Sequence, residues 1–151
     1  IIVNVRKKYH HKGEYEMINV IGGPKGSGKT KEIIRRANDA LDVCKGNIVY
    51  ITDTSEYSRE INTSIRFINI REYFSPGTAG MLGFLCGVVA SNTDVGKIYI
   101  DGLSRILSAP AEETEELFMA LDELSEAHNV DFVISVTFDK PPKFMKKYID
   151  K

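Results

Sequence analysis

Lys29 and Thr30 are the residues whose types and spacing most clearly predict chemistry, because they end a glycine-rich stretch that begins at Gly23. This stretch fits G-x-x-x-x-G-K-[ST] at every fixed position, a pattern whose backbone N–H groups wrap the phosphates of a nucleotide. Lys29 is expected to place its ammonium on the β- and γ-phosphates, and Thr30 to bind Mg²⁺ through its hydroxyl. The expected nucleotide-contacting residues are Gly23, Pro24, Lys25, Gly26, Ser27, Gly28, Lys29 and Thr30.

A phosphate-binding loop of this kind should follow a strand and open a helix. Residues 15–21 (Tyr-Glu-Met-Ile-Asn-Val-Ile) form a strand-like run before the loop, and Gly46 is a natural end for the helix after it. Between them, apolar residues recur at three-to-four-residue spacing, which is typical of one helix face; they are Ile33, Ile34, Ala37, Ala40, Leu41 and Cys44. The alternative is a Gly-Ser turn that matches by chance, and both flanks argue against it.

Asp101 ends the apolar run Lys97-Ile98-Tyr99-Ile100, which reads as a strand. Four mostly apolar residues followed by Asp resemble the second signature of P-loop NTPases. That resemblance implies that Asp101 holds Mg²⁺, usually through water, opposite the Thr30 hydroxyl. An Asp after an apolar strand is weak evidence by itself, but its pairing with the phosphate-binding loop strengthens the prediction.

The chain alternates strands with helices, which predicts an α/β fold: a three-layer αβα sandwich with a mainly parallel sheet. Ligands of such sheets lie at the carboxyl ends of the strands, where Asp53 and Thr137 also fall. After the first strand and helix, the expected strands cover 47–53, 65–70, 96–102 and 130–138, and the expected helices cover 78–91 and a segment that starts near Ser108.

The bulk composition predicts one domain, residues 1–151, with an ordinary globular balance of 42% hydrophobic and 27% charged residues. The net charge of -1 provides no global attraction to nucleic acid or an acidic membrane. No apolar run is long enough to span a bilayer. Cys44 and Cys86 fit no metal spacing, so both are expected to be buried reduced thiols in a cytoplasmic protein.

Two segments leave alternatives open. Residues 1–5 read as a strand and 6–13 as a basic turn, so the sequence favours an N-terminal β-hairpin. Its basic tip is either a solvated turn, which we favour, or a contact with phosphate or nucleic acid.

The helix expected over 78–91 is apolar nearly all round. It is either a buried core helix, the interpretation we favour, or an oligomer interface.

Taken together, these motifs resemble the P-loop NTPase superfamily, and Ile100-Asp101-Gly102-Leu103-Ser104 is similar to its RecA/KaiC-like (ASCE) branch. The resemblance covers Met17 to about Thr137. In that branch a Glu just after the second core strand polarises the attacking water, so Asp53 and Glu56 are the candidates here, although neither position matches cleanly. The resemblance also implies that Thr137 or Ser135 senses the γ-phosphate. It further implies an arginine finger, for which the candidates are Arg59, Arg71 and Arg105, with a surface ion pair favoured for each.

The function that the resemblance implies is ATP binding, with Mg²⁺-dependent hydrolysis in an oligomeric or partner-dependent motor or switch. A small-molecule or nucleotide kinase is the second hypothesis, because that class shares the loop and the size. A nucleotide-dependent binding module without catalysis is the third, because the water-activating carboxylate is not clearly matched. Expected partners are a nucleotide and a second copy or another protein, with nucleic acid allowed by the basic segments.

Overall fold

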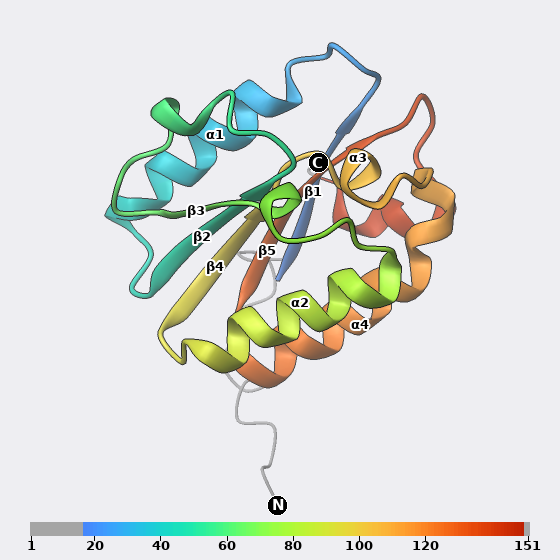
Figure 1. Cartoon of the computed structure of the whole chain (residues 1–151). Coiled ribbons are helices and arrows are strands. Elements are labelled where there is room, and N and C mark those ends of the chain that lie inside the picture. The colour runs from blue at the N-terminus through green and yellow to red at the C-terminus, as the bar shows by residue number, and fades with distance from the viewer. Residues whose placement is uncertain (1–16, 150–151) are drawn as a thin grey trace, which may run out of the picture.

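The computed structural model describes residues 17–149, so the expected N-terminal strand, basic turn and hairpin lie outside the described residues. The described chain forms an α/β fold built on one five-stranded sheet (Figure 1). The strands are β1 (Ile18–Gly23), β2 (Asn47–Thr52), β3 (Arg66–Asn69), β4 (Val95–Ile100) and β5 (Asp131–Thr137). Each lies within two or three residues of the boundaries expected from the sequence.

All strand pairs are parallel, and the order across the sheet is β1-β5-β4-β2-β3. The strand before the glycine-rich loop therefore pairs with the last strand, in a register that joins Ile18 to Phe132 and Gly23 to Thr137. Parallel strands need crossover connections, and here helices supply them. The mainly parallel sheet expected from the alternating pattern is confirmed.

Helices cover both faces of the sheet (Figure 1). On one face α1 (Lys29–Asp39) packs Ile33 and Ala37 against Tyr50 and Tyr99. The opposite face, reached by alternate residues of the same strands, is covered by α2 (Thr78–Ser91), α3 (Leu103–Leu107) and α4 (Glu115–His128). This alternation places a separate apolar core on each side of the sheet.

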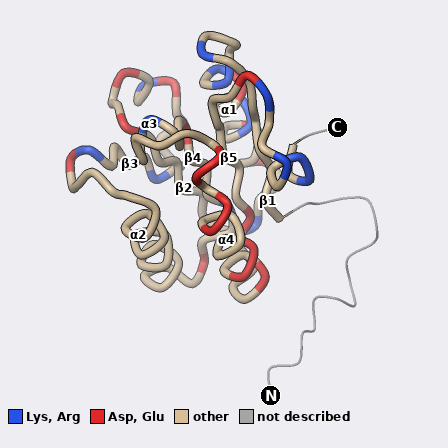
Figure 2. The backbone as a smooth tube through the Cα atoms, turned by 90° about the vertical axis from the view of Figure 1, so that its right-hand side faces the viewer, with Lys and Arg blue, Asp and Glu red and all other residues tan. Residues whose placement is uncertain are grey.

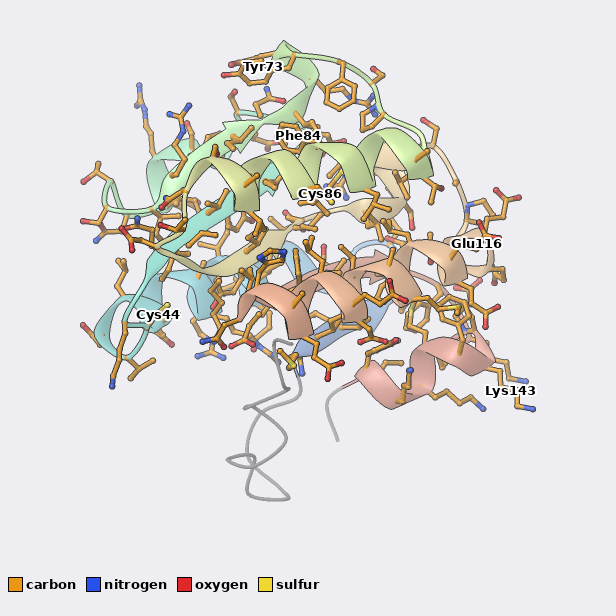
Figure 3. All side chains as sticks on the ribbon, turned by 90° about the horizontal axis from the view of Figure 1, so that it is seen from below. Cys44, Tyr73, Phe84, Cys86, Glu116 and Lys143 are labelled. Carbon is orange, nitrogen blue, oxygen red and sulfur yellow. The ribbon has the colours of Figure 1, made fainter. Side chains whose placement is uncertain are left out.

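Only one face of α2 is buried, so the expectation of a fully buried core helix is wrong for its other face. Met81, Leu85 and Val89 point into the core at helical spacing, whereas Gly83 and Cys86 on the opposite side are exposed. In Figure 3, α2 lies beside α4, with Cys86 and Phe84 labelled on it. Cys86 is a free thiol on the surface, which corrects the expectation that both cysteines are buried; Cys44 is free and half-buried.

The acidic residues of α4 lie on a solvated face, as their spacing predicts. Glu116, Glu123 and Glu126 are exposed, while Leu117 and Leu121 of the same helix are fully buried. Figure 2 shows the acidic positions in red along this helix. The described part of the chain contains no helix both long and apolar enough to cross a membrane.

Several short helical segments were not expected from the sequence. They include α3, which begins directly after Gly102, and a 3₁₀ segment, Lys143–Tyr148, in the basic tail. Met145 and Tyr148 of this segment are buried against the core, and the ring of Phe118 of α4 contacts that of Tyr148 at a tilt of 37°, with centroids 5.2 Å apart. The tail is therefore not only a run of charges, because its apolar residues complete one face of the sheet.

Candidate functional site

The loop between β1 and α1 has a backbone that glycine makes possible. Gly26 and Gly28 have φ angles of 80° and 86°, in the left-handed region where side chains other than glycine are strained. Gly28 is also the N-cap residue that precedes α1, and the Ser27 N–H donates to Pro24 O at 3.2 Å to tighten the turn. The first N–H groups of α1 thus face the loop, and they carry the partial positive charge of a helix N-terminus.

Lys29 folds back over this loop. Its ammonium donates to Gly23 O at 3.0 Å, to Pro24 O at 2.8 Å and to Ser27 Oγ at 3.4 Å. Burial lowers the pKa of Lys29, and the positive charge of Arg105 lowers it further, while Asp101 acts in the opposite direction. Three oxygens of the loop therefore hold the Lys29 ammonium, and Arg105 and Asp101 line the same cavity.

Asp101 is the centre of a buried polar cluster at the carboxyl ends of the strands. It is 2% exposed and accepts from three hydroxyl groups: Ser135 Oγ at 2.6 Å, Tyr50 OH at 3.3 Å and Thr30 Oγ1 at 3.4 Å. Ser135 Oγ in turn accepts from the Gly102 N–H at 2.7 Å. Burial and the charge of Asp101 both raise the pKa of Tyr50, so that phenol stays a hydrogen-bond donor. These bonds fix the orientation of the carboxylate.

Arg105 and Asp53 form an ion pair next to this cluster. Arg105 Nε lies 3.3 Å and 3.2 Å from the two Asp53 carboxylate oxygens, and Nη2 lies 3.2 Å from Oδ1. The guanidinium crosses directly over Gly102, because a Cβ built on that glycine would lie 2.2 Å from Nη2. Of the three arginine-finger candidates, Arg105 is therefore the one that the structure pairs with a carboxylate beside the loop, whereas Arg71 donates to Ser75 Oγ and to Arg105 O.

A cavity of about 510 Å³ joins these parts. Its walls come from the loop, from α1, from the ends of β4 and β5, and from the segment after β2. The lining residues are Lys25, Gly26, Gly28, Lys29, Thr30, Lys31, Ile34, Tyr57, Glu60, Asp101, Arg105, Ser135 and Thr137.

The structure brings together most of the residues that the sequence selected, but not all of them. Thr137 lines the cavity, so its place at the end of β5 is as expected. Asp53 is partly buried against Arg105, and Glu56 is exposed with its N–H bonded to Thr54 Oγ1; neither carboxylate is among the described residues that line the cavity. Glu60, which lies seven residues after Asp53 in the segment that follows β2, does line the cavity.

Sequence reasoning did not single out Tyr50, Tyr57 or Glu60. Tyr50 lies within an apolar strand and reads as core, although its hydroxyl reaches Asp101. Tyr57 and Glu60 lie in the polar segment after β2, where Glu60 is the last residue of a short 3₁₀ helix, Ser58–Glu60. The turn there, in which the Glu60 N–H donates to Tyr57 O at 3.0 Å, has no periodic signal in the sequence that could have found it.

The donor atoms suit a hard divalent cation that shares its coordination with a ligand. Thr30 and Asp101 offer oxygen, and Mg²⁺ is commonly bound through one or two carboxylates together with substrate phosphates. Among the described residues there is no group of three or more His, Cys, Asp or Glu side chains that could enclose a metal alone. Neither protein-family models nor curated proteins gave a match to this chain.

Proposed function

We propose that this chain is a P-loop nucleotide-binding domain of the RecA/KaiC-like kind that binds ATP and hydrolyses it with Mg²⁺, in an oligomeric or partner-dependent motor or switch. The observation that carries the proposal is the contact between the Thr30 hydroxyl and Asp101, beside Lys29. Two motifs far apart in the sequence thereby supply a hydroxyl and a carboxylate to one point. That point lies at the carboxyl ends of parallel strands, where ligands of such sheets bind.

The loop has the properties that a polyphosphate needs. The hydrogen bonds of Lys29 to Pro24 O and Ser27 Oγ are exposed, so phosphate oxygens can replace these acceptors at little cost. Lys25, Lys31 and Arg105 bring three further cations to the same cavity. Together with the N-terminal amides of α1, they favour a ligand of high negative charge.

Mg²⁺ fits the same place, with Thr30 and Asp101 as the protein groups that would hold it. When bound, the ion neutralises charge on the β- and γ-phosphates. Ser135 and Tyr50 hold the Asp101 carboxylate in a fixed orientation through hydrogen bonds. Such partners of a ligating group matter nearly as much as the ligand itself.

For hydrolysis we assign the water-facing carboxylate to Glu60 in preference to Asp53 or Glu56, because Glu60 lines the cavity. Asp101, Lys29 and Thr30 line the same cavity. A carboxylate there can orient a water molecule and accept its proton. Thr137, at the opposite wall, is proposed to donate to the terminal phosphate.

A small-molecule kinase is the second candidate, and one observation favours it. The cavity extends past the loop to Tyr57 and Glu60, which leaves a polar wall with an aromatic side chain beyond the phosphate region. An acceptor hydroxyl could bind there in place of water. The same wall is compatible with a binding module that holds nucleotide without turnover.

The test is nucleotide turnover by the purified chain with Mg²⁺ and ATP, alone, with single-stranded or duplex DNA, and with candidate phosphate acceptors. Phosphate release that is lost in Lys29→Ala and kept in Lys45→Ala, an exposed lysine outside the cavity lining, supports the ATPase. Transfer of phosphate to an acceptor establishes the kinase instead. Binding without turnover under every condition establishes the binding module, and absence of nucleotide binding refutes all three.

A further inference from the structure

Arg105 holds a carboxylate while it lies at a cavity suited to phosphates. Its contacts with Asp53 use Nε and Nη2 and leave Nη1 outside the pair. The Arg105 side chain is 50% exposed and that of Asp53 is 15% exposed, so the arginine is the more accessible partner. A guanidinium that binds a carboxylate side-on has the geometry to bind a phosphate in the same way.

The position of Arg105 is built into the backbone. Arg71 donates to Arg105 O at 2.7 Å, which fixes the main chain of α3 at this residue. Gly102, with a φ of 81° and no side chain, leaves the space that the guanidinium crosses. The main chain of Arg105 is therefore anchored, while its half-exposed guanidinium is held by the contacts with Asp53.

The charges around the cavity favour such a change when a phosphate enters. Lys29 and Arg105 are close enough for the charge of one to affect the other, and Asp101 is already bound by Ser135, Tyr50 and Thr30. Asp53 is therefore the carboxylate that satisfies Arg105. A terminal phosphate carries more negative charge than a carboxylate and offers more acceptor oxygens.

We propose that Arg105 recognises the terminal phosphate of a bound nucleoside triphosphate, and that Asp53 is its internal competitor, which holds the guanidinium whenever that phosphate is absent. The inference rests on the proposed function and adds to it the discrimination between triphosphate and diphosphate. On this view Asp53 does not activate water; it sets the affinity for the triphosphate by opposing its contact with Arg105.

The experiment is isothermal titration of the full chain with Mg²⁺ and either ADP or the non-hydrolysable β,γ-imido analogue of ATP. Arg105→Ala should raise the dissociation constant of the analogue about 10-fold to 100-fold and that of ADP less than about 3-fold. Asp53→Asn should lower the dissociation constant of the analogue about 2-fold to 5-fold and leave that of ADP unchanged. Arg66→Ala, an exposed arginine outside the cavity lining, is the control and should change neither value.

A double variant makes the inference independent of folding defects. The gain in analogue affinity from Asp53→Asn should vanish in the Arg105→Ala background. Thermal melting identifies any variant that is unfolded. If Arg105→Ala is unfolded, Arg105→Lys replaces it and should weaken the binding of the analogue by a smaller factor, without weakening that of ADP. Weaker or unchanged analogue binding in Asp53→Asn, or an equal loss for both nucleotides in the Arg105 variant, overturns the inference while leaving the proposed function in place. If the wild-type chain binds neither nucleotide, the proposed function fails, and this inference fails with it.

Discussion

Thr30 and Asp101 are 71 positions apart in the sequence, and the hydroxyl of the first lies 3.4 Å from the carboxylate of the second. The contact exists because α1 starts at the end of β1, and because β4, which ends next to Asp101, lies only one strand away across β5. The sheet order therefore brings two separate motifs together at the carboxyl ends of the strands. Substitution of either residue tests the function of the pair.

Asp101→Asn should weaken Mg²⁺-dependent nucleotide binding by about 10-fold or more, and Mg²⁺-free binding much less, because the amide keeps the shape of the side chain but removes its charge. Titration calorimetry with and without the metal measures both effects. Thr30→Val should behave in the same way, while Thr30→Ser keeps a hydroxyl and should stay near wild type. Equal affinities for wild type and Asp101→Asn in both conditions would show that the metal assignment is wrong.

Ser135→Ala should lower the free energy of unfolding by about 1–3 kcal/mol, because it leaves the buried Gly102 N–H without its acceptor and removes the shortest hydrogen bond of Asp101. Urea denaturation measures the change. Ser104→Ala is the matched control: its Oγ is buried and has no hydrogen-bond partner among the described residues, so its removal should leave stability unchanged or raise it. A similar loss in both variants would argue against a specific role for the Ser135 bridge.

Glu60→Gln should reduce steady-state phosphate release about 100-fold while nucleotide affinity changes less than about 3-fold, because an amide cannot accept the proton of water. Glu56→Gln, in the same segment but outside the cavity lining, is the control and should retain the wild-type rate. Loss of activity in Glu56→Gln with full activity in Glu60→Gln would reverse the assignment. Product analysis in the presence of acceptors extends the same test to the kinase hypothesis.

Stability should fall in acid partly through Glu32 on α1. Arg35 and Arg36 both donate to this carboxylate, at 2.7–3.0 Å, and the hydrogen bonds from Arg35 and then Arg36 lower the pKa of Glu32 to about 2. A carboxylate with a depressed pKa contributes stability above its ordinary value of 4.5 and loses it as the pH falls toward 2.

Glu32→Gln should therefore lower the melting temperature by only roughly 1–3 °C near pH 6, because ion pairs between exposed side chains are weak. The difference should disappear by about pH 2, where the wild-type carboxylate becomes protonated. Melting curves at a series of pH values measure this. Arg35→Ala should flatten the same slope only in part, since Arg36 still donates to Glu32. A difference that stays constant from pH 6 to pH 2 would contradict the assignment.

Most of the fold could be predicted from the sequence, because the signals are local. Apolar runs marked the strands, and α2 begins and ends at the expected residues, whereas α1 ends at Asp39 and a 3₁₀ turn, Ala40–Asp42, follows it, so the helix end expected at Gly46 is wrong. The exposed face of α2 could not be predicted from its apolar composition, because burial depends on what packs against a helix. The loop and Asp101 were found through their spacing.

The carboxylates of the site were harder to predict, because side-chain partners are set by tertiary contacts. Asp53 was selected for its place at a strand end, yet it pairs with Arg105, which lies 52 positions later in the chain. Glu60 reaches the cavity only because the segment after β2 turns back at Tyr57. No periodicity in the sequence reports that turn.

The pairing of β1 with β5 has a consequence for how the chain folds. β1 is the first described strand, but its strand neighbour is the last, so the phosphate-binding loop acquires its supporting sheet only when Ile18 meets Phe132. Contacts of such long sequence separation form slowly, since a large loop must close before they can stabilise anything. During synthesis the complete glycine-rich segment will leave the ribosome well before β5 does. We therefore expect a nascent chain to gain nucleotide affinity only once residues beyond Thr137 have emerged.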